Sequence, residues 1–265
     1  MKYKMLVLDM DDTLLNDDHT ISDENKEMLA KAQELGVYVI LASGRPTPAM
    51  IAYAKELQLD NSYMISYNGA VITDLKEDKI IFEQMLTQKQ IHELYDYSIK
   101  SKTHIITYID GKIVSETDSE YIEIEKKITG LAHNKVVSFK EEVQSSAVKC
   151  ILLQEPSYLK EVEKDLKIDM PHLSVSMSKP FFLEVAQNGI DKGASIEFLA
   201  KKLNILQSEI IAVGNAGNDL TMIEYAGLGI WVDNVDPELR HRGDFIVASN
   251  NNHGVAEVVR RFILN

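Results

Sequence analysis

The chain has 265 residues, of which 45% are hydrophobic and 26% charged, so it can build a sizeable core and has an ordinary globular composition. Its formal charge of −13 argues against a general partner for nucleic acid or an acidic membrane, because such partners require a basic face. A small phosphorylated metabolite needs only a few local cations and is the kind of partner that we expect.

The single cysteine and the spread of apolar residues bear on the cell compartment. Cys150 lies in the apolar run "VKCILL" and has no second cysteine to pair with, so we expect a buried structural thiol. The first residues, "MKYKMLVLDM", lack the apolar segment of a signal peptide, and no run approaches the roughly 18 apolar residues of a membrane span. These features indicate a cytoplasmic protein.

The first part of the chain alternates strands with helices. An apolar run over 4–9 predicts a strand buried on both faces, and the next helix is expected to begin after an N-cap at Ser22. A second buried strand is predicted over 37–43, and a helix follows it. Asn68-Gly69 between two apolar runs predicts a hairpin. The alternation is typical of a parallel sheet with helical crossovers.

The middle of the chain has a different pattern, with hairpins among helices and no flexible linker on either side. A turn at Asp110-Gly111 predicts a hairpin. Helices are expected over 88–100, 118–130 and 157–167, and strands over 147–154 and 173–178. This mixture indicates an inserted α+β unit.

The alternation of strands and helices returns near residue 190. The predicted elements are a helix over 192–203, a strand over 209–215, a helix over 219–226, strands over 228–232 and 244–249, and a helix over 254–263. We therefore predict an α/β fold in which residues 1–83 and 188–265 form a Rossmann-like parallel-sheet core and residues 84–187 form an inserted α+β cap domain. Ligands of such sheets bind beyond the carboxyl ends of the strands.

The first strand ends in the acidic sequence "DMDDT". In an extended segment Asp9 and Asp11 point the same way, and two such carboxylates repel each other unless a cation or a shared proton lies between them. A hard divalent cation such as Mg²⁺ suits these oxygen ligands. The alternative is an acidic turn with no chemistry.

The second strand ends in "ASGR". The hydroxyl of Ser43 could donate to a phosphate oxygen, and Arg45 follows after Gly44. The alternative is a polar turn in which Ser43 satisfies backbone groups.

Two further candidates lie in the last part of the chain. Lys192 opens a helix, where an anion would benefit from both the lysine and the free N–H groups, although a solvated surface lysine is the commoner case. The turn "GNAGND" follows a strand and supplies Asn215, Asn218 and Asp219. Asp219 could instead be the N-cap of the next helix, which would leave Asn215 facing the site.

In combination these motifs are far more specific. In chain order, "DMDDT", a strand-terminal serine in "ASGR", a lysine in "DKG" and "GNAGND" resemble the four motifs of the haloacid dehalogenase-like hydrolases. The long insertion, "YNGA" and "FFLEVAQNGIDKGASIEFLAKKL" resemble the Cof-type, sugar-phosphatase branch with a large α/β cap. The resemblance covers essentially the whole chain.

The resemblance implies roles for these residues. Asp9 would be the nucleophile that forms an aspartyl-phosphate, and Asp11 the general acid and then base. Mg²⁺ would be held by Asp9, the main-chain carbonyl of Asp11, and the "GNAGND" loop through Asn215 and Asp219. Contacts to the loop or to the phosphoryl group would come from Thr13, Ser43, Gly44, Arg45, Lys192 and Asn218. The cap would close over the site and choose the leaving group, with Ser178, Lys179 and Phe182 as candidate contacts.

The chain departs from the family pattern at two positions. Asp12 stands where glycine is often found, which we expect to be harmless. Asn215 stands where the family usually has aspartate, so we expect weaker Mg²⁺ binding, because hard divalent ions depend on ligand charge.

The expected activity is a Mg²⁺-dependent phosphatase acting on small phosphomonoesters, sugar phosphates in the first place. Two alternatives stay open: a phosphomutase on the same fold, and a non-catalytic phosphometabolite-binding protein whose metal site Asn215 has weakened. The oligomeric state is open as well.

Overall fold

The computed structural model describes residues 2–264, and their contacts divide the chain into two compact units, Met1–Phe82 with Asp191–Asn265, and Glu83–Ile190. The boundaries expected from the sequence differ from these by one residue at the first crossing and by three at the second.

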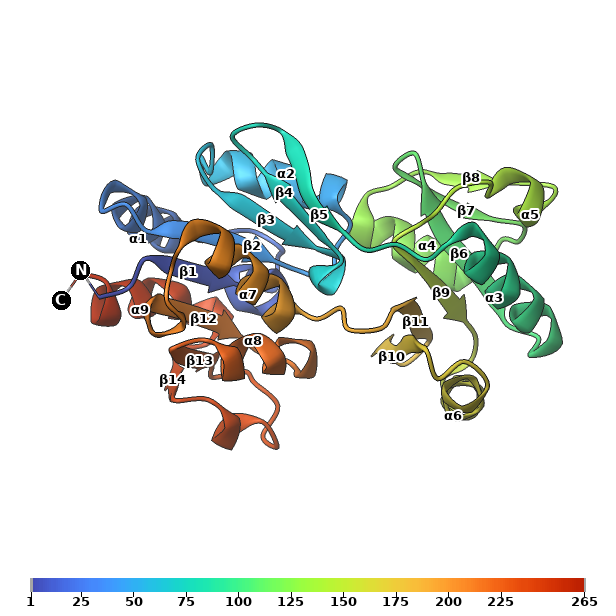
Figure 1. The fold of residues 1–265 in the computed structure, drawn as a ribbon. Helices are drawn as coiled ribbons and strands as arrows, with labels where there is room; N and C mark the ends of the chain where they lie inside the picture. Colours follow the sequence, from blue (N-terminus) through green and yellow to red (C-terminus); the bar gives the residue numbers. More distant parts are fainter. Residues whose placement is uncertain (1, 265) are drawn as a thin grey trace. The chain divides into compact units, whose positions relative to one another are not determined.

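An eight-stranded sheet forms the centre of the first unit (Figure 1), with the order β14-β13-β12-β1-β2-β3-β4-β5. The pairs from β14 to β3 are parallel, and β4 returns antiparallel to β3. The strands are β1 (Met5–Leu8), β2 (Tyr38–Ala42), β3 (Tyr63–Ser66), β4 (Val71–Asp74), β5 (Lys79–Glu83), β12 (Ile210–Gly214), β13 (Leu228–Val232) and β14 (Phe245–Val247).

Helices cover both faces of this sheet because its central strands are apolar on both sides. Leu6 and Leu8 of β1 join the core beneath one helical layer, and Met5 and Val7 join the core beneath the other. The first layer contains α1 (Asp23–Glu34), α2 (Thr47–Glu56) and α9 (Gly254–Phe262), and the second contains α7 (Lys192–Leu203) and α8 (Leu220–Tyr225). The predicted α/β core is confirmed.

The second unit is built on a six-stranded sheet with the order β10-β11-β9-β6-β7-β8. Its strands are β6 (His104–Ile109), β7 (Lys112–Ser115), β8 (His133–Lys135), β9 (Lys149–Leu153), β10 (Leu173–Lys179) and β11 (Phe182–Gln187). Its helices are α3 (Gln88–Lys100), α4 (Glu120–Thr129), α5 (Phe139–Glu142) and α6 (Pro156–Asp169). Cys150 is fully buried in its core, as expected.

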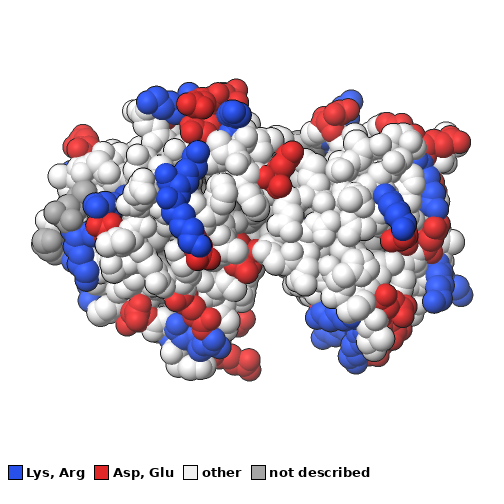
Figure 2. Space-filling model, viewed as in Figure 1, with Lys and Arg blue, Asp and Glu red and all other residues white. Residues whose placement is uncertain are grey.

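Charge is mixed on the visible surface. On the face shown in Figure 2, basic and acidic side chains are interspersed and no continuous basic band crosses the drawn residues. That face therefore has no basic surface of the kind that binds the phosphate backbone of a nucleic acid. Among residues 2–264, no helix has the length and apolar character needed to cross a membrane.

Candidate active site

Lys192 lies at the centre of the candidate site. Its Nζ is 2.6 Å from Oδ1 of Asp9, which follows β1, and 2.6 Å from Oδ1 of Asp219, which follows β12. The lysine side chain is 0% exposed, so the alternative of a solvated surface lysine is wrong. A buried ammonium group requires such partners, because burial without them costs several kcal/mol, on the order of the desolvation of an ion.

One buried cation therefore serves two buried carboxylates. Burial raises the pKa of Asp9 to about 7, and the charge of Asp219 adds to this rise while Lys192 opposes it. Burial alone would lower the pKa of Lys192, but Asp219 and Asp9 outweigh burial and raise it. Lys192 is thus a permanent cation beside the carboxylate of Asp9.

Asp219 is an organiser of the loop after β12. Its Oδ2 accepts hydrogen bonds from the backbone N–H groups of Asn215 and Ala216, at 3.0 and 3.1 Å. Asp219 occupies the N-cap position of α8, as the alternative interpretation expected, but its side chain makes no cap hydrogen bond to that helix. The approach is close, since a Cβ added at Gly214 would lie 2.6 Å from the Cβ of Asp219. The acid holds both the loop and Lys192.

Asp11 has a different partner from Asp9. Arg45 Nε donates to Oδ2 of Asp11 at 2.9 Å, and Arg45 Nη2 donates to Oδ1 at 2.6 Å. The extended strand that was expected to carry both residues does not continue past Asp9, because a tight turn over Met10–Leu14 follows it, and the two carboxylates have different partners. The charges of Asp219 and Asp11 both raise the pKa of Asp9, and the effect of Asp219 is the larger of the two.

The Arg45 side chain is buried and bonded to Asp11. Its side chain is 9% exposed, and its guanidinium lies 5.4 Å from the ring centroid of Tyr53. Burial would lower the pKa of Arg45, but the Asp11 carboxylate outweighs burial and raises it. The two parallel hydrogen bonds from the Arg45 guanidinium therefore hold the Asp11 carboxylate in one orientation.

Ser43 ends β2 and is buried, with 1% of its surface exposed. Its Oγ accepts from the backbone N–H of Arg45 at 3.1 Å, which leaves the hydroxyl hydrogen available to a ligand. Across from Gly44 lies Asn68, whose side-chain Oδ1 accepts from Nδ2 of Asn218 at 3.1 Å. The "ASGR" and "GNAGND" loops thus meet through Asn68.

The turn after β1 contains two further features. Thr13 is fully buried, and its Oγ1 has no hydrogen-bond partner among the described residues. Asn234 donates from Nδ2 to the carbonyl of Asp12 at 2.7 Å and so holds the turn from the β13 side. The sequence reasoning missed Asn234, and its only local signal is a polar residue just beyond a buried strand.

The oxygen donors present at the site are of the kind that Mg²⁺ takes. Among residues 2–264, no group of three or more His, Cys, Asp or Glu side chains is placed to hold a metal. Within the described part of the chain, Asp9 uses only Oδ1, for Lys192, and the side chain of the partly exposed Asn215 makes no hydrogen bond. These oxygens and the Asp11 carbonyl are hard donors of the kind Mg²⁺ takes alongside water. Asp219 uses Oδ2 for the two loop amides and Oδ1 for Lys192, so a metal contact from this residue would have to share an oxygen that already has a partner.

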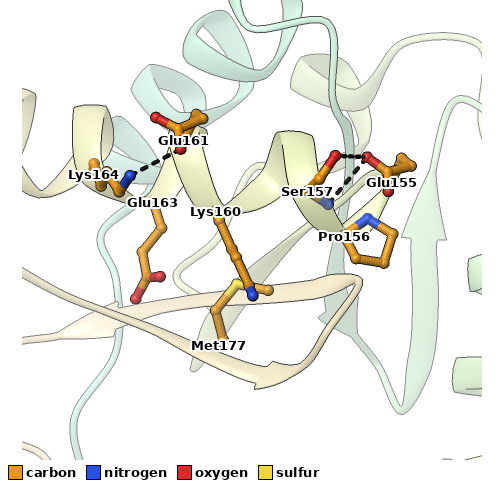
Figure 3. A pocket seen from close by; sticks show the side chains of 8 residues that line it. All are labelled: Glu155, Pro156, Ser157, Lys160, Glu161, Glu163, Lys164 and Met177. Atoms are coloured by element: carbon orange, nitrogen blue, oxygen red, sulfur yellow. Dashed lines mark hydrogen bonds and ion pairs between the residues drawn. The ribbon is translucent and has the colours of Figure 1, made fainter.

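A cavity of about 600 Å³ in the second unit contains none of these residues. Figure 3 shows it between α6 and β10, lined by Met177 and by polar groups that largely pair with one another. Lys164 bonds Glu161, and Ser157 bonds Glu155. Such a solvated helix face gives no reason to move the site away from the strand ends of the first unit.

Comparisons with known proteins identify the family. The model for haloacid dehalogenase-like hydrolases matches residues 6–259. YxeH of Bacillus subtilis is 32% identical, with 99% of each chain covered. The 5-amino-6-(5-phospho-D-ribitylamino)uracil phosphatase YcsE of Bacillus subtilis is 28% identical and covers 98% of this chain and 96% of its own. A solved haloacid dehalogenase-like hydrolase from Bacteroides thetaiotaomicron is similar with a TM-score of 0.93, at 32% identity over 99% of this chain and 100% of that one. The chain belongs to the haloacid dehalogenase-like hydrolase family.

Proposed function

We propose that this hydrolase is a Mg²⁺-dependent phosphatase of small phosphomonoesters, sugar phosphates in the first place. The observation that carries the proposal is the carboxylate of Asp9, buried at the end of β1. One of its oxygens bonds Lys192, and the other has no hydrogen bond to any residue between 2 and 264. A carboxylate so placed can attack phosphorus while a fixed cation offsets the charge that gathers there.

Asp9 and Asp11 divide the chemistry between them. In the first step Asp9 bonds to phosphorus, the bond from phosphorus to the leaving oxygen breaks, and Asp11 gives that oxygen a proton. In the second step Asp11 takes a proton from water, whose oxygen attacks phosphorus and frees Asp9 and inorganic phosphate. Lys192 and Ser43 hold phosphoryl oxygens. When bound by Asp9, the Asp11 carbonyl and Asn215, Mg²⁺ would neutralise charge on those oxygens.

The bidentate pair of Asp11 with Arg45 adds a condition to this scheme. A carboxyl group that carries a proton is uncharged and a weaker acceptor for the guanidinium hydrogen bonds, so we expect the pair to loosen when Asp11 acts as the acid. An anionic substrate gives Arg45 a competing partner. Binding of a phosphate ester would then prepare the acid.

The names of relatives support the phosphate-ester substrate. YcsE is named for a phosphorylated ribityl compound, and a Bacillus subtilis relative 25% identical over 98% of this chain is named as phosphatase YwpJ. We propose that residues 84–187 act as the cap that selects the leaving group, as the family resemblance implies.

The test is hydrolysis of 4-nitrophenyl phosphate by the purified chain with Mg²⁺ and with EDTA. Turnover that requires Mg²⁺ and is lost in Asp9→Asn supports the proposal. A folded protein that does not turn over at high Mg²⁺ contradicts it and leaves the non-catalytic phosphometabolite-binding alternative. A panel of sugar phosphates and other phosphate esters then identifies the preferred substrate.

A further inference from the structure

The turn over residues 66–70, "SYNGA", contacts several parts of the candidate site. The backbone N–H of Asn68 donates to the carbonyl of Ser43 at 2.9 Å. Ser195, in the first turn of α7, donates from Oγ to the carbonyl of Gly69 at 2.7 Å. A Cβ added at Gly69 would lie 2.4 Å from the carbonyl oxygen of Asp191, just before Lys192. The turn is therefore fixed against the loops that carry Ser43 and Lys192.

The backbone of this turn is left-handed at two residues with side chains. Tyr67 has φ 53° and Asn68 has φ 55°. Glycine adopts this region freely, whereas other residues pay a cost, on the order of 1 kcal/mol each, with asparagine among the least penalised. Position 68 thus has a side chain although its backbone conformation favours glycine.

The amide of Asn68 is partly exposed and lies against Gly44, since a Cβ added there would be 3.1 Å from both Nδ2 and Oδ1 of Asn68. Oδ1 accepts from Asn218. Nδ2 donates to no acceptor among the described residues, although it carries two N–H groups. An unused donor therefore lies between the "ASGR" and "GNAGND" loops.

We propose that Asn68 is a substrate-binding residue that donates from Nδ2 to a phosphoryl oxygen of the substrate, beside Ser43. This inference rests on the proposed function in one respect, the phosphorylated ligand. The hydrogen bond from Asn218 occupies Oδ1 of Asn68, so the group that remains to bind a ligand is the Nδ2 amide. A turn residue chosen only for its backbone would have no such role.

Asn68→Gly separates the two roles, because it removes the amide and keeps a residue that favours positive φ. Asn204→Gly is the matched control: Asn204 has φ 54°, is exposed, and ends α7. We expect kcat/KM for 4-nitrophenyl phosphate to fall roughly tenfold to a hundredfold in Asn68→Gly, as for the loss of a hydrogen bond to a charged group, and to stay within about twofold in Asn204→Gly. Asn68→Asp should lose more, because a carboxylate repels the phosphoryl group. Thermal unfolding verifies that each variant is folded.

Inorganic phosphate provides a readout that does not depend on turnover. Its Kd, measured by calorimetry, should rise in Asn68→Gly and not in Asn204→Gly. If the wild type binds phosphate but hydrolyses nothing, a weaker Asn68→Gly still supports the inference while the proposed function fails. Asn68→Gly with wild-type kcat/KM and wild-type phosphate Kd overturns the inference and leaves the proposed function intact. A wild type that neither hydrolyses nor binds phosphate overturns both.

Discussion

Removal of the positive charge at Lys192 is the perturbation whose size follows most directly from the structure. In Lys192→Met the carboxylates of Asp9 and Asp219 stay buried, but the ammonium group 2.6 Å from each is gone. Deleting one partner of a buried ion pair costs about 3–5 kcal/mol. In a chain of this size that corresponds to a fall in Tm of roughly 6–20 °C. Lys201→Met is the control, because its pair with Glu197 is exposed to solvent and contributes little to stability.

The pH dependence of this loss has a definite sign. Burial and Asp219 already hold the pKa of Asp9 above its ordinary value, and loss of Lys192 removes the group that opposes them. At a pH between the pKa of Asp9 in the unfolded chain and its higher pKa in the folded variant, Asp9 is protonated in the folded variant and ionised in the unfolded chain. By linkage, its stability rises as pH falls through the folded pKa towards the unfolded one. The loss of Tm should be larger at pH 8 than at pH 5.5.

The assay is thermal unfolding of wild type, Lys192→Met and Lys201→Met in EDTA at these two pH values. A loss in Lys192→Met of the size seen in Lys201→Met would refute the central place of this lysine. An equal loss at pH 8 and pH 5.5 would refute the explanation through the buried carboxylates.

Three other predictions concern separate residues. Asn215→Asp adds a charge to the donor set, so half-saturation by Mg²⁺ should need concentrations lower by an order of magnitude or so; unchanged Mg²⁺ dependence contradicts the charge argument. Arg45→Lys removes the planar fork that orients Asp11, so alkyl phosphates, which need a proton on the leaving oxygen, should lose more kcat than 4-nitrophenyl phosphate; equal losses contradict it. Cys150 is buried and its pKa is raised to about 12, so the native thiol should resist a disulfide reagent at pH 8 that labels it at once after unfolding; fast labelling of the folded chain contradicts this.

Much of the first unit could be predicted because its strands are apolar on both faces. The apolar runs that became β1, β2 and β12 were recognisable for that reason. The strands β5, β8 and β11 were not predicted. β8 has only three residues, and β5 is largely exposed, with Ile80 49% accessible, so neither has a clear pattern of burial.

The candidate residues were recognisable in the sequence, but their pairing was not. Whether Lys192 is solvated or buried depends on how α7 lies against β1 and β12, which no local pattern contains. The different partners of Asp9 and Asp11 accompany a tight turn that begins at Met10, where the strand was expected to continue. Asn68 has the sequence of an ordinary turn, and only the structure shows what its amide contacts.

Accumulation of a phosphorylated Asp9 is the most direct test of the central claim. In Asp11→Asn the water of the second step loses its base, whereas 4-nitrophenol leaves without needing an acid. Mixing this variant with 4-nitrophenyl phosphate and Mg²⁺ should release a burst of one nitrophenol per site, and mass spectrometry after acid quench should find a phosphoryl group on the peptide containing Asp9. No burst and no phosphorylated peptide, in a variant that still hydrolyses the substrate slowly, would contradict the account.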